Sequence, residues 1–341
     1  MTMAVSMALA VAFLCALGIT WWLSRPGAWL AALDIPNERS LHDTPKPRGG
    51  GLGVLAGFGV GMVAAFGLLP ADTAMPALVV AMMLVAGVSY ADDRMHVGIG
   101  VRLAVQGLAA ALAIGWGGLT PTILTLPGIS VEIGTVLGFA LAMLAVVWLT
   151  NLYNFMDGMD GLAGTMSCVG LGTLAWLASS QAPGLALLAG LLAAGAAGFL
   201  VWNAPPARIF MGDVGASTLG FAAAVLILWG DKSAAFPWWL GMLVFAVFIA
   251  DATVTLVRRA LNRERVWKAH RTHFYQRLVT LGWSHRRALT LNATLMLTCS
   301  LAAFSAQSVD PVWQWVTLVA VAALLGGTMV WITLLERTRT L

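Results

Sequence analysis

The pattern most suggestive of chemistry in this sequence is a run of amides and acids that follows an apolar stretch. Its four members recur at every third position, so neighbours in the set share one face of a helix. Amides combined with carboxylates suit a divalent cation, or a nucleobase edge that needs both donors and acceptors. Glycines after both acids interrupt the helix and let a ligand approach the backbone. A capped turn would need only one or two such residues, so we interpret these four as functional: Asn151, Asn154, Asp157 and Asp160.

Acids also stand at the ends of two other apolar stretches. Asp92 and Asp93 follow a run that ends at Tyr90. An ionised aspartate deep in a bilayer costs roughly 2.5 to 3.5 kcal/mol, so this pair is expected at the membrane interface. It lies there either beside a cation or as a loop start neutralised by Arg94 and Arg102. Asp213 opens a later helix, either as its N-cap or as a carboxylate ligand of Mg²⁺ bridging phosphate oxygens. Phe210 offers a face for stacking.

Two basic segments suit phosphate groups. Lys46 and Arg48 precede three glycines, although the glycines also resemble ordinary helix packing and form no Walker pattern. Residues 258–287 hold nine basic side chains and three histidines. A zinc site is disfavoured there because no cysteine is near; contact with anionic lipid and recognition of phosphate by arginine are both compatible with the segment. Asp251 lies in the apolar run before it, and its role is left open.

These residues are embedded in a strongly apolar chain. The 341 residues are 60% hydrophobic and 10% charged, and the mean hydropathy is +0.86. Soluble domains are about a quarter charged, so we predict an all-α integral membrane protein with a single polytopic domain, 1–341. About eleven runs approach the roughly 17 to 25 residues that cross a bilayer: 3–23, 51–70, 74–90, 102–118, 134–150, 159–179, 184–202, 215–230, 236–257, 288–306 and 311–334.

The basic residues predict an orientation. Read with eleven spans, eighteen of the nineteen lysines and arginines lie in alternate connections and in the C-terminal tail, and Lys232 alone lies on the other side. The positive-inside rule then places the N-terminus outside and the C-terminus in the cytoplasm. Because the basic residues lie in loops between spans, lipid headgroups, nucleotides and phosphates are expected partners and nucleic acid is not. The candidate active site falls on the cytoplasmic loops 24–50, 91–102, 151–161, 203–215 and 258–287.

The longest outward connection predicts a small hairpin. Residues 119–134 alternate apolar and polar side chains around Pro127-Gly128, a pattern typical of two strands joined by a turn.

Four spaced motifs, in this order, resemble the polyprenyl-phosphate N-acetylhexosamine-1-phosphate transferase superfamily, glycosyltransferase family 4. They are Asp92-Asp93, the segment from Asn154 to Gly161 followed by Leu-Ala-Gly, Phe210-Met-Gly-Asp-Val-Gly215, and His270 to Arg277. The resemblance implies about eleven transmembrane helices in the bacterial cytoplasmic (inner) membrane. It also implies a UDP-N-acetylamino sugar as donor, undecaprenyl phosphate as acceptor, UMP as product, and Mg²⁺, with Mn²⁺ as an alternative, as cofactor.

The resemblance assigns roles to these residues. Asp92, Asp93, Asp157, His270 and His273 match catalytic positions, and Asp213 matches the metal ligand. The candidate substrate-binding residues are Asn151, Asn154, Asp160 and Phe210 from the resemblance, and Lys46, Arg48 and Arg271 from the basic segments.

The sequence departs from the family at two points. His96 stands where an acid or amide often follows the acidic pair, and His-Arg-Thr-His replaces the triple histidine of the phospho-muramoyl-pentapeptide branch. We therefore expect an enzyme that initiates O-antigen or another surface polysaccharide. A homodimer is compatible with this expectation. A cation-coupled transporter is the alternative, although its acids would lie near the bilayer midplane. A prenyl transferase is a third reading, but the further acid that its aspartate-rich motif needs is not found after Asp92-Asp93.

Overall fold

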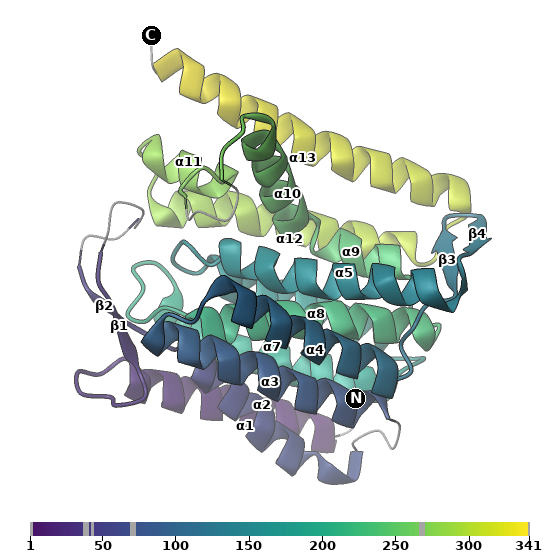
Figure 1. Cartoon of the computed structure of the whole chain (residues 1–341), viewed down its shortest axis with the longest axis horizontal. Helices are drawn as coiled ribbons and strands as arrows, with labels where there is room; N and C mark the ends of the chain where they lie inside the picture. Colours follow the sequence, from purple (N-terminus) through teal and green to yellow (C-terminus); the bar gives the residue numbers. More distant parts are fainter. Residues whose placement is uncertain (1–2, 37–40, 42–43, 69–72, 266–269, 340–341) are drawn as a thin grey trace.

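The computed structural model describes residues 3–36, 41, 44–68, 73–265 and 270–339. The predicted loops 24–50 and 258–287 are therefore described only in part. Long helices lie side by side in a bundle, and the segments that connect them lie at its two ends (Figure 1).

Each of the eleven predicted apolar runs contains a helix. Eight are long and apolar enough to span a membrane by length and composition: α1 (Met3–Leu23), α3 (Ala74–Met95), α4 (Ile99–Trp116), α5 (Gly134–Phe155), α7 (Pro183–Asn203), α8 (Asp213–Lys232), α12 (His285–Ala306) and α13 (Pro311–Arg339). The count of eleven spans and the orientation of the termini stay predictions.

Three predicted spans differ from simple rods. The run 51–70 forms α2 (Gly51–Ala64) and a 3-10 turn, η1 (Phe66–Leu68), and the run 159–179 forms α6 (Leu162–Ala178). At 1.5 Å per residue, the 14 residues of α2 span only about 21 Å. The run 236–257 is divided between α9 (Trp238–Val244) and α10 (Ala246–Leu261), which meet at a bend of 80°. The hydropathy of the sequence does not predict this bend, because the run 236–257 stays apolar through it.

Helix α8 is the centre of the bundle. Of its membrane-length window, 94% is buried inside the protein, and it packs against α3, α5 and α2. Gly51 at the start of α2 faces Gly215 so closely that a side chain on either residue would meet the backbone of the other helix. This packing holds the first turn of α8, with Asp213, among the surrounding helix ends.

Two small sheets lie at opposite ends of the bundle (Figure 1). Strands β3 (Ile123–Leu126) and β4 (Ile129–Glu132) form the predicted hairpin, with Gly128 at φ +71° in its turn. Strands β1 (Ala32–Asp34) and β2 (Lys46–Arg48) form a second antiparallel pair that the sequence analysis did not predict. The short helix α11 (Phe274–Thr280) lies at the same end as β1 and β2.

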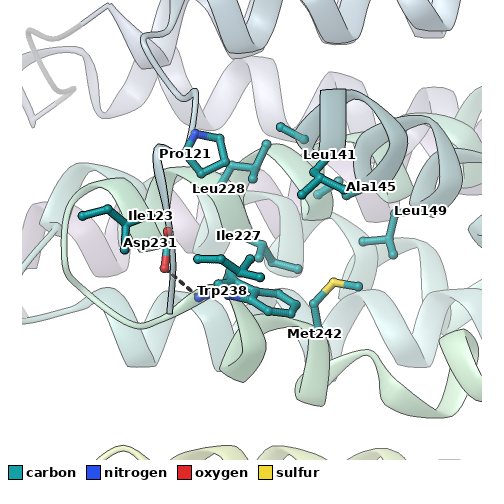
Figure 2. Close-up of a pocket in the computed structure, with 13 residues that line it drawn as sticks. Pro121, Ile123, Leu141, Ala145, Leu149, Ile227, Leu228, Asp231, Trp238 and Met242 are labelled. Carbon is teal, nitrogen blue, oxygen red and sulfur yellow. Dashed lines mark hydrogen bonds between the residues drawn. The ribbon is translucent and has the colours of Figure 1, made fainter. Parts of the chain in front are cut away.

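The hairpin end holds an apolar cavity of about 290 Å³ between α5, α8, α9 and β3. Figure 2 shows Trp238 among the residues that line it, and the Trp238 backbone N–H donates to Asp231 at 2.9 Å. The predicted site residues lie toward the other end of the bundle.

Candidate active site

The first turn of α8 is held by a carboxylate from α3. The backbone N–H groups of Asp213 and Val214 donate to the two oxygens of Asp93, each at 3.0 Å. Gly212 makes this approach feasible, because it has φ +80° and a Cβ there would lie 2.8 Å from Asp93 Oδ2. Asp93 therefore satisfies two N–H groups that a helix start leaves without partners. The Asp93 side chain is only 3% exposed.

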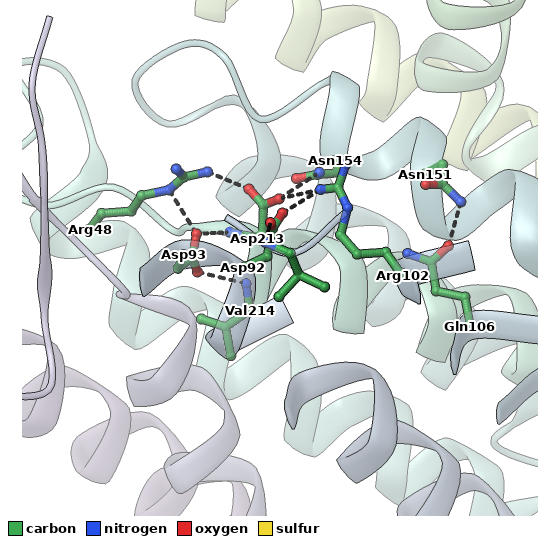
Figure 3. Close-up of polar contacts among 10 residues, drawn as sticks. Arg48, Asp92, Asp93, Arg102, Gln106, Asn151, Asn154, Asp213 and Val214 are labelled. Carbon is green, nitrogen blue, oxygen red and sulfur yellow. Dashed lines mark hydrogen bonds and ion pairs between the residues drawn. The ribbon is translucent and has the colours of Figure 1, made fainter. Parts of the chain in front are cut away.

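Two arginines join Asp93, Asp92 and Asp213 into one cluster (Figure 3). Arg48 contacts Asp93 through Nε at 3.0 Å and Asp213 through Nη2. Arg102 contacts Asp92 and lies 3.3 Å from Asp213 Oδ2. We call these five residues the acid-arginine cluster. Its arginine side chains are about a third exposed, 33% for Arg48 and 28% for Arg102, so their donors are accessible to a ligand.

Asn154 completes the surroundings of Asp213. Its Nδ2 donates to Asp213 Oδ2 at 3.1 Å. Asn151, one turn earlier on α5, instead donates to Gln106 Oε1 at 2.7 Å (Figure 3). The structure thus brings Asn154 into the cluster and places Asn151 against α4.

Arg48 reaches the cluster because its strand joins the loop before α8. Phe210 N–H donates to the carbonyl of Pro47 at 2.9 Å, and the N–H groups of Gly49 and Gly50 donate to the carbonyl of Phe210 at 3.1 and 2.9 Å. Hydropathy carries no signal for this pairing.

Sequence reasoning missed two contributors. Arg102 was considered only as a neutralising charge, and Gln106 was not considered. They lie one turn apart in the N-terminal half of α4.

Asp160 forms a second site beside the cluster. Its Oδ2 accepts the N–H of Ala207 at 2.9 Å and lies 3.9 Å from Lys46 Nζ. The same ammonium group lies 5.2 Å from the centre of the Phe210 ring. Predicted substrate-binding residues from three segments therefore meet here. An aromatic face beside a cation and a carboxylate can stack on a base and bind its polar edge.

Asp157 and Asp160 have opposite electrostatic surroundings. Burial raises the pKa of Asp157 well above its usual value; Arg48 opposes the shift, while Asp213 and Asp93 add to it. Burial also acts on Asp160, but His285, the Ala207 N–H and Lys46 together hold the pKa of that carboxyl below its usual value. Carboxyls whose pKa values are driven apart can hold a proton at one position and a charge at the other.

The histidine motif lies around α11. Asp251 on α10 accepts the backbone N–H groups of Phe274 at 2.9 Å and Tyr275 at 3.1 Å, and lies 3.1 Å from His273 Nδ1. His273 is 2% exposed and its ring stacks on that of His270, with centroids 4.8 Å apart. Asp251, whose role the sequence left open, therefore holds the start of α11.

The outer part of the motif connects to α5 and to solvent. The Tyr275 hydroxyl donates to the carbonyl of Phe155 at 3.1 Å, directly after Asn154. Burial lowers the pKa of His270 to about 4, and His273, Arg259 and Arg258 add to the shift. Arg271 is exposed. The hydrogen bonds of His270 and His273 lead to Thr272, Asp251 and Gln276 and not to the acid-arginine cluster. The roles assigned to His270, His273 and Arg271 therefore stay predictions.

The donor set of the cluster fits a hard divalent cation. Carboxylate oxygens from α3 and α8 converge on the same two guanidinium groups. Among the described residues, no group of three or more His, Cys, Asp or Glu side chains is arranged to hold a metal by itself. Mg²⁺ is commonly held by one or two carboxylates together with waters and substrate phosphates, so two carboxylates beside cationic donors for phosphate suit it.

Comparison with known proteins identifies a matching family and several relatives that cover most of the chain. The sequence pattern described as Glycosyl transferase family 4 matches residues 75–231. A probable undecaprenyl-phosphate N-acetylglucosaminyl 1-phosphate transferase of Bacillus subtilis is 31% identical over 303 residues, covering 87% of this chain and 84% of the relative. A decaprenyl-phosphate N-acetylglucosaminephosphotransferase of Mycobacterium tuberculosis is 31% identical, covering 88% and 82%.

A phospho-N-acetylmuramoyl-pentapeptide-transferase of Symbiobacterium thermophilum is 34% identical over a shorter region, 64% of this chain and 70% of the relative. The matched residues 75–231 include Asp92, Asp93, Asn154 and Asp213, which the fold brings together. The chain belongs to glycosyl transferase family 4, the superfamily of polyprenyl-phosphate N-acetylhexosamine-1-phosphate transferases.

Proposed function

We propose that the chain transfers an N-acetylamino-sugar 1-phosphate from a UDP-sugar to undecaprenyl phosphate, giving a polyprenyl-diphosphate-sugar and UMP. The observation that carries the proposal is the acid-arginine cluster at the start of α8, where Asp213 lies between Arg48 and Arg102. Two phosphorylated substrates must meet in this reaction, and the cluster offers carboxylates for a metal and guanidinium groups for phosphates side by side.

In this proposal a phosphate oxygen of the lipid attacks the sugar-bearing phosphorus of the UDP-sugar. The bond from that phosphorus to the bridging oxygen breaks, UMP leaves with the bridging oxygen, and the anomeric bond of the sugar stays intact. The second pKa of a phosphate ester is about 6, so the lipid phosphate is mostly ionised at pH 7. Positioning of the acceptor by Asp92 is then as useful as removal of a proton.

We assign a separate task in this reaction to each of the residues around Asp213. Asp213, with Asp92 as its neighbour, would hold Mg²⁺, which supplies charge stabilisation at the diphosphate when bound. Arg48 and Arg102 would move from the carboxylates onto phosphate oxygens. Asn154 orients Asp213 through its 3.1 Å hydrogen bond. In phosphoryl transfer, positioning and electrostatic stabilisation supply most of the rate enhancement.

The second site would receive the nucleoside. Phe210 offers a stacking face, with Lys46 5.2 Å from its ring centre and Asp160 beyond. Asn151 faces Gln106, so we assign it to the shape of the site rather than to direct contact.

We further propose a place for the reaction in the cell. The relatives from Bacillus subtilis and Mycobacterium tuberculosis are named as transferases for undecaprenyl phosphate and decaprenyl phosphate. The departure at His270 to His273 disfavours the pentapeptide substrate of the Symbiobacterium relative. The protein would then lie in the bacterial inner membrane and start O-antigen or a similar surface polysaccharide. UDP-N-acetylglucosamine is the first donor to test.

The test uses purified protein with undecaprenyl phosphate, Mg²⁺ and a panel of UDP-amino sugars, with UMP and the lipid product measured. We expect UMP and lipid-linked sugar in equal amounts with at least one donor, and loss of both when EDTA removes the metal. Flux of a substrate into proteoliposomes without UMP formation would favour the transporter instead. Release of pyrophosphate in place of UMP would favour a prenyl transferase.

A further inference from the structure

Asp160 is the meeting point of three segments that are far apart in the sequence. Its Oδ2 accepts the backbone N–H of Ala207 at 2.9 Å, lies 3.3 Å from His285 Nδ1 and lies 3.9 Å from Lys46 Nζ. The Asp160 side chain is 6% exposed. Because burial weakens screening by solvent, each of these contacts influences where the carboxylate and its partners lie.

The start of α12 places His285 beside Asp160. Ser284 caps this helix, with its hydroxyl accepting the N–H of Arg287 at 3.2 Å, so His285 occupies the first helical turn. Its Nδ1 is shielded from solvent and makes no hydrogen bond within the described part of the chain, yet it lies 3.3 Å from Asp160 Oδ2. With its proton on Nδ1, a small rotation of the ring would let this nitrogen donate to the carboxylate. The lowered pKa of Asp160, to which His285 contributes, agrees with such a contact.

Lys46 links the position of the Asp160 carboxylate to the nucleoside end of the site. The carboxylate holds the ammonium group 3.9 Å away, and the ammonium group lies 5.2 Å from the centre of the Phe210 ring. Two residues further along β2, Arg48 joins the acid-arginine cluster. A displaced Asp160 would therefore shift Lys46 and Phe210 while the cluster keeps its own partners.

We propose that His285 is a positioning residue for the nucleotide-sugar, because it fixes the Asp160 carboxylate that in turn holds Lys46 beside Phe210. This inference rests on the proposed function. It concerns the UDP-sugar and not the lipid phosphate, because the contacts of His285 lead to the nucleoside end of the site.

The test compares His285→Ala with His285→Asn, whose amide nitrogen can replace Nδ1. In UMP-release assays, His285→Ala should raise KM for the UDP-sugar about 10-fold, as expected for a lost hydrogen bond to a charged group. KM for undecaprenyl phosphate and kcat should stay within about twofold. His285→Asn should recover most of the loss. In the Asp160→Asn background, His285→Ala should add little, because the acceptor is already changed.

Thr290→Ala is the matched control, since Thr290 is exposed on the same helix and its hydroxyl bonds to the carbonyl of Arg286 in its own helix. Equal changes in both KM values, no rescue by asparagine, or no change at all would overturn the inference. If the alanine variant does not fold, His285→Leu keeps the volume without the donor. Calorimetric binding of the UDP-sugar with Mg²⁺ gives the same comparison without turnover, so absence of UMP from wild type would contradict only the proposed function.

Discussion

Two helices in this protein begin in the same way, yet their surroundings differ. Asp93 from α3 accepts two N–H groups at the start of α8, and Asp251 from α10 accepts two at the start of α11. At α11 the carboxylate and its histidine are both buried, with side chains 5% and 3% exposed. At α8 the first residue is another acid, Asp213, which faces two partly exposed arginines.

The comparison separates a structural cap from a chemical site. Both caps satisfy buried N–H groups, which are costly when left without partners. Only the α8 start adds a carboxylate and exchangeable cationic partners, the combination that a metal and phosphates need. Whether an aspartate that caps a helix start indicates a functional site therefore depends on the capped residue. Its side chain and the groups that this side chain faces decide the matter.

The largest effect should follow from Asp213→Asn. Losing this carboxylate removes the proposed metal ligand, so Mg²⁺-dependent UMP release should fall about 10² to 10³-fold. The Asp93 cap uses only backbone N–H groups of α8, so the melting temperature should change little. Activity close to wild type would contradict the metal assignment, and a large drop in melting temperature would erase the distinction between the two helix starts.

Asp251→Ala should give the opposite signature. Two buried N–H groups of α11 lose their acceptor and His273 loses its partner, so we expect a destabilisation of about 2 kcal/mol. Thermal unfolding in detergent measures it. UMP release per folded molecule should fall less than in Asp213→Asn. A greater loss of activity at unchanged stability would move the histidine motif into the chemistry.

Gly212→Ala tests the cap of α8 itself. Gly212 has φ +80° and ψ 165°, a conformation that costs other residues about 1 to 3 kcal/mol, and the new Cβ would crowd Asp93. Both the melting temperature and the rate of UMP release should fall. Gly172→Ala, in a helix and with open space around it, is the control. Unchanged activity in Gly212→Ala would show that the chemistry tolerates a displaced Asp93.

The effect that is smallest at neutral pH concerns His270 and the pH dependence of stability. Its pKa falls from 6.5 to about 4 in the folded protein, so the unfolded chain binds more protons between these values. The stabilisation is complete above about pH 6.5 and is lost as pH falls toward 4. Melting temperatures recorded from pH 7 to pH 4 should decline less steeply in His270→Asn than in wild type. Parallel declines would show that His270 is not the titrating group.

The sequence predicted the helices well because their cause is local. Each of the eleven apolar runs contains a helix, and the alternating residues around Gly128 form the hairpin. The bend between α9 and α10 was missed because apolar character continues through Phe245, and the β1 to β2 pair was missed because three-residue strands carry little pattern.

The site was predictable in its residue types and less so in its partners. Asp92, Asp93, Asn154 and Asp213 were all selected from spacing and resemblance, and they do converge. Arg102 and Gln106 come from the next helix, and nothing local marks them as partners of Asp213 and Asn151. Such contacts depend on how α4 packs, which a single sequence does not specify.

The reaction itself is tested most directly by following the β-phosphate of the donor. UDP-N-acetylglucosamine labelled with ³²P at the β-phosphate is incubated with the purified protein, Mg²⁺ and undecaprenyl phosphate, and label is measured in the lipid and nucleotide fractions. Transfer of a sugar 1-phosphate predicts label in the lipid and unlabelled UMP in equal amount. Label retained in released UDP, with unlabelled sugar on the lipid, would contradict the account.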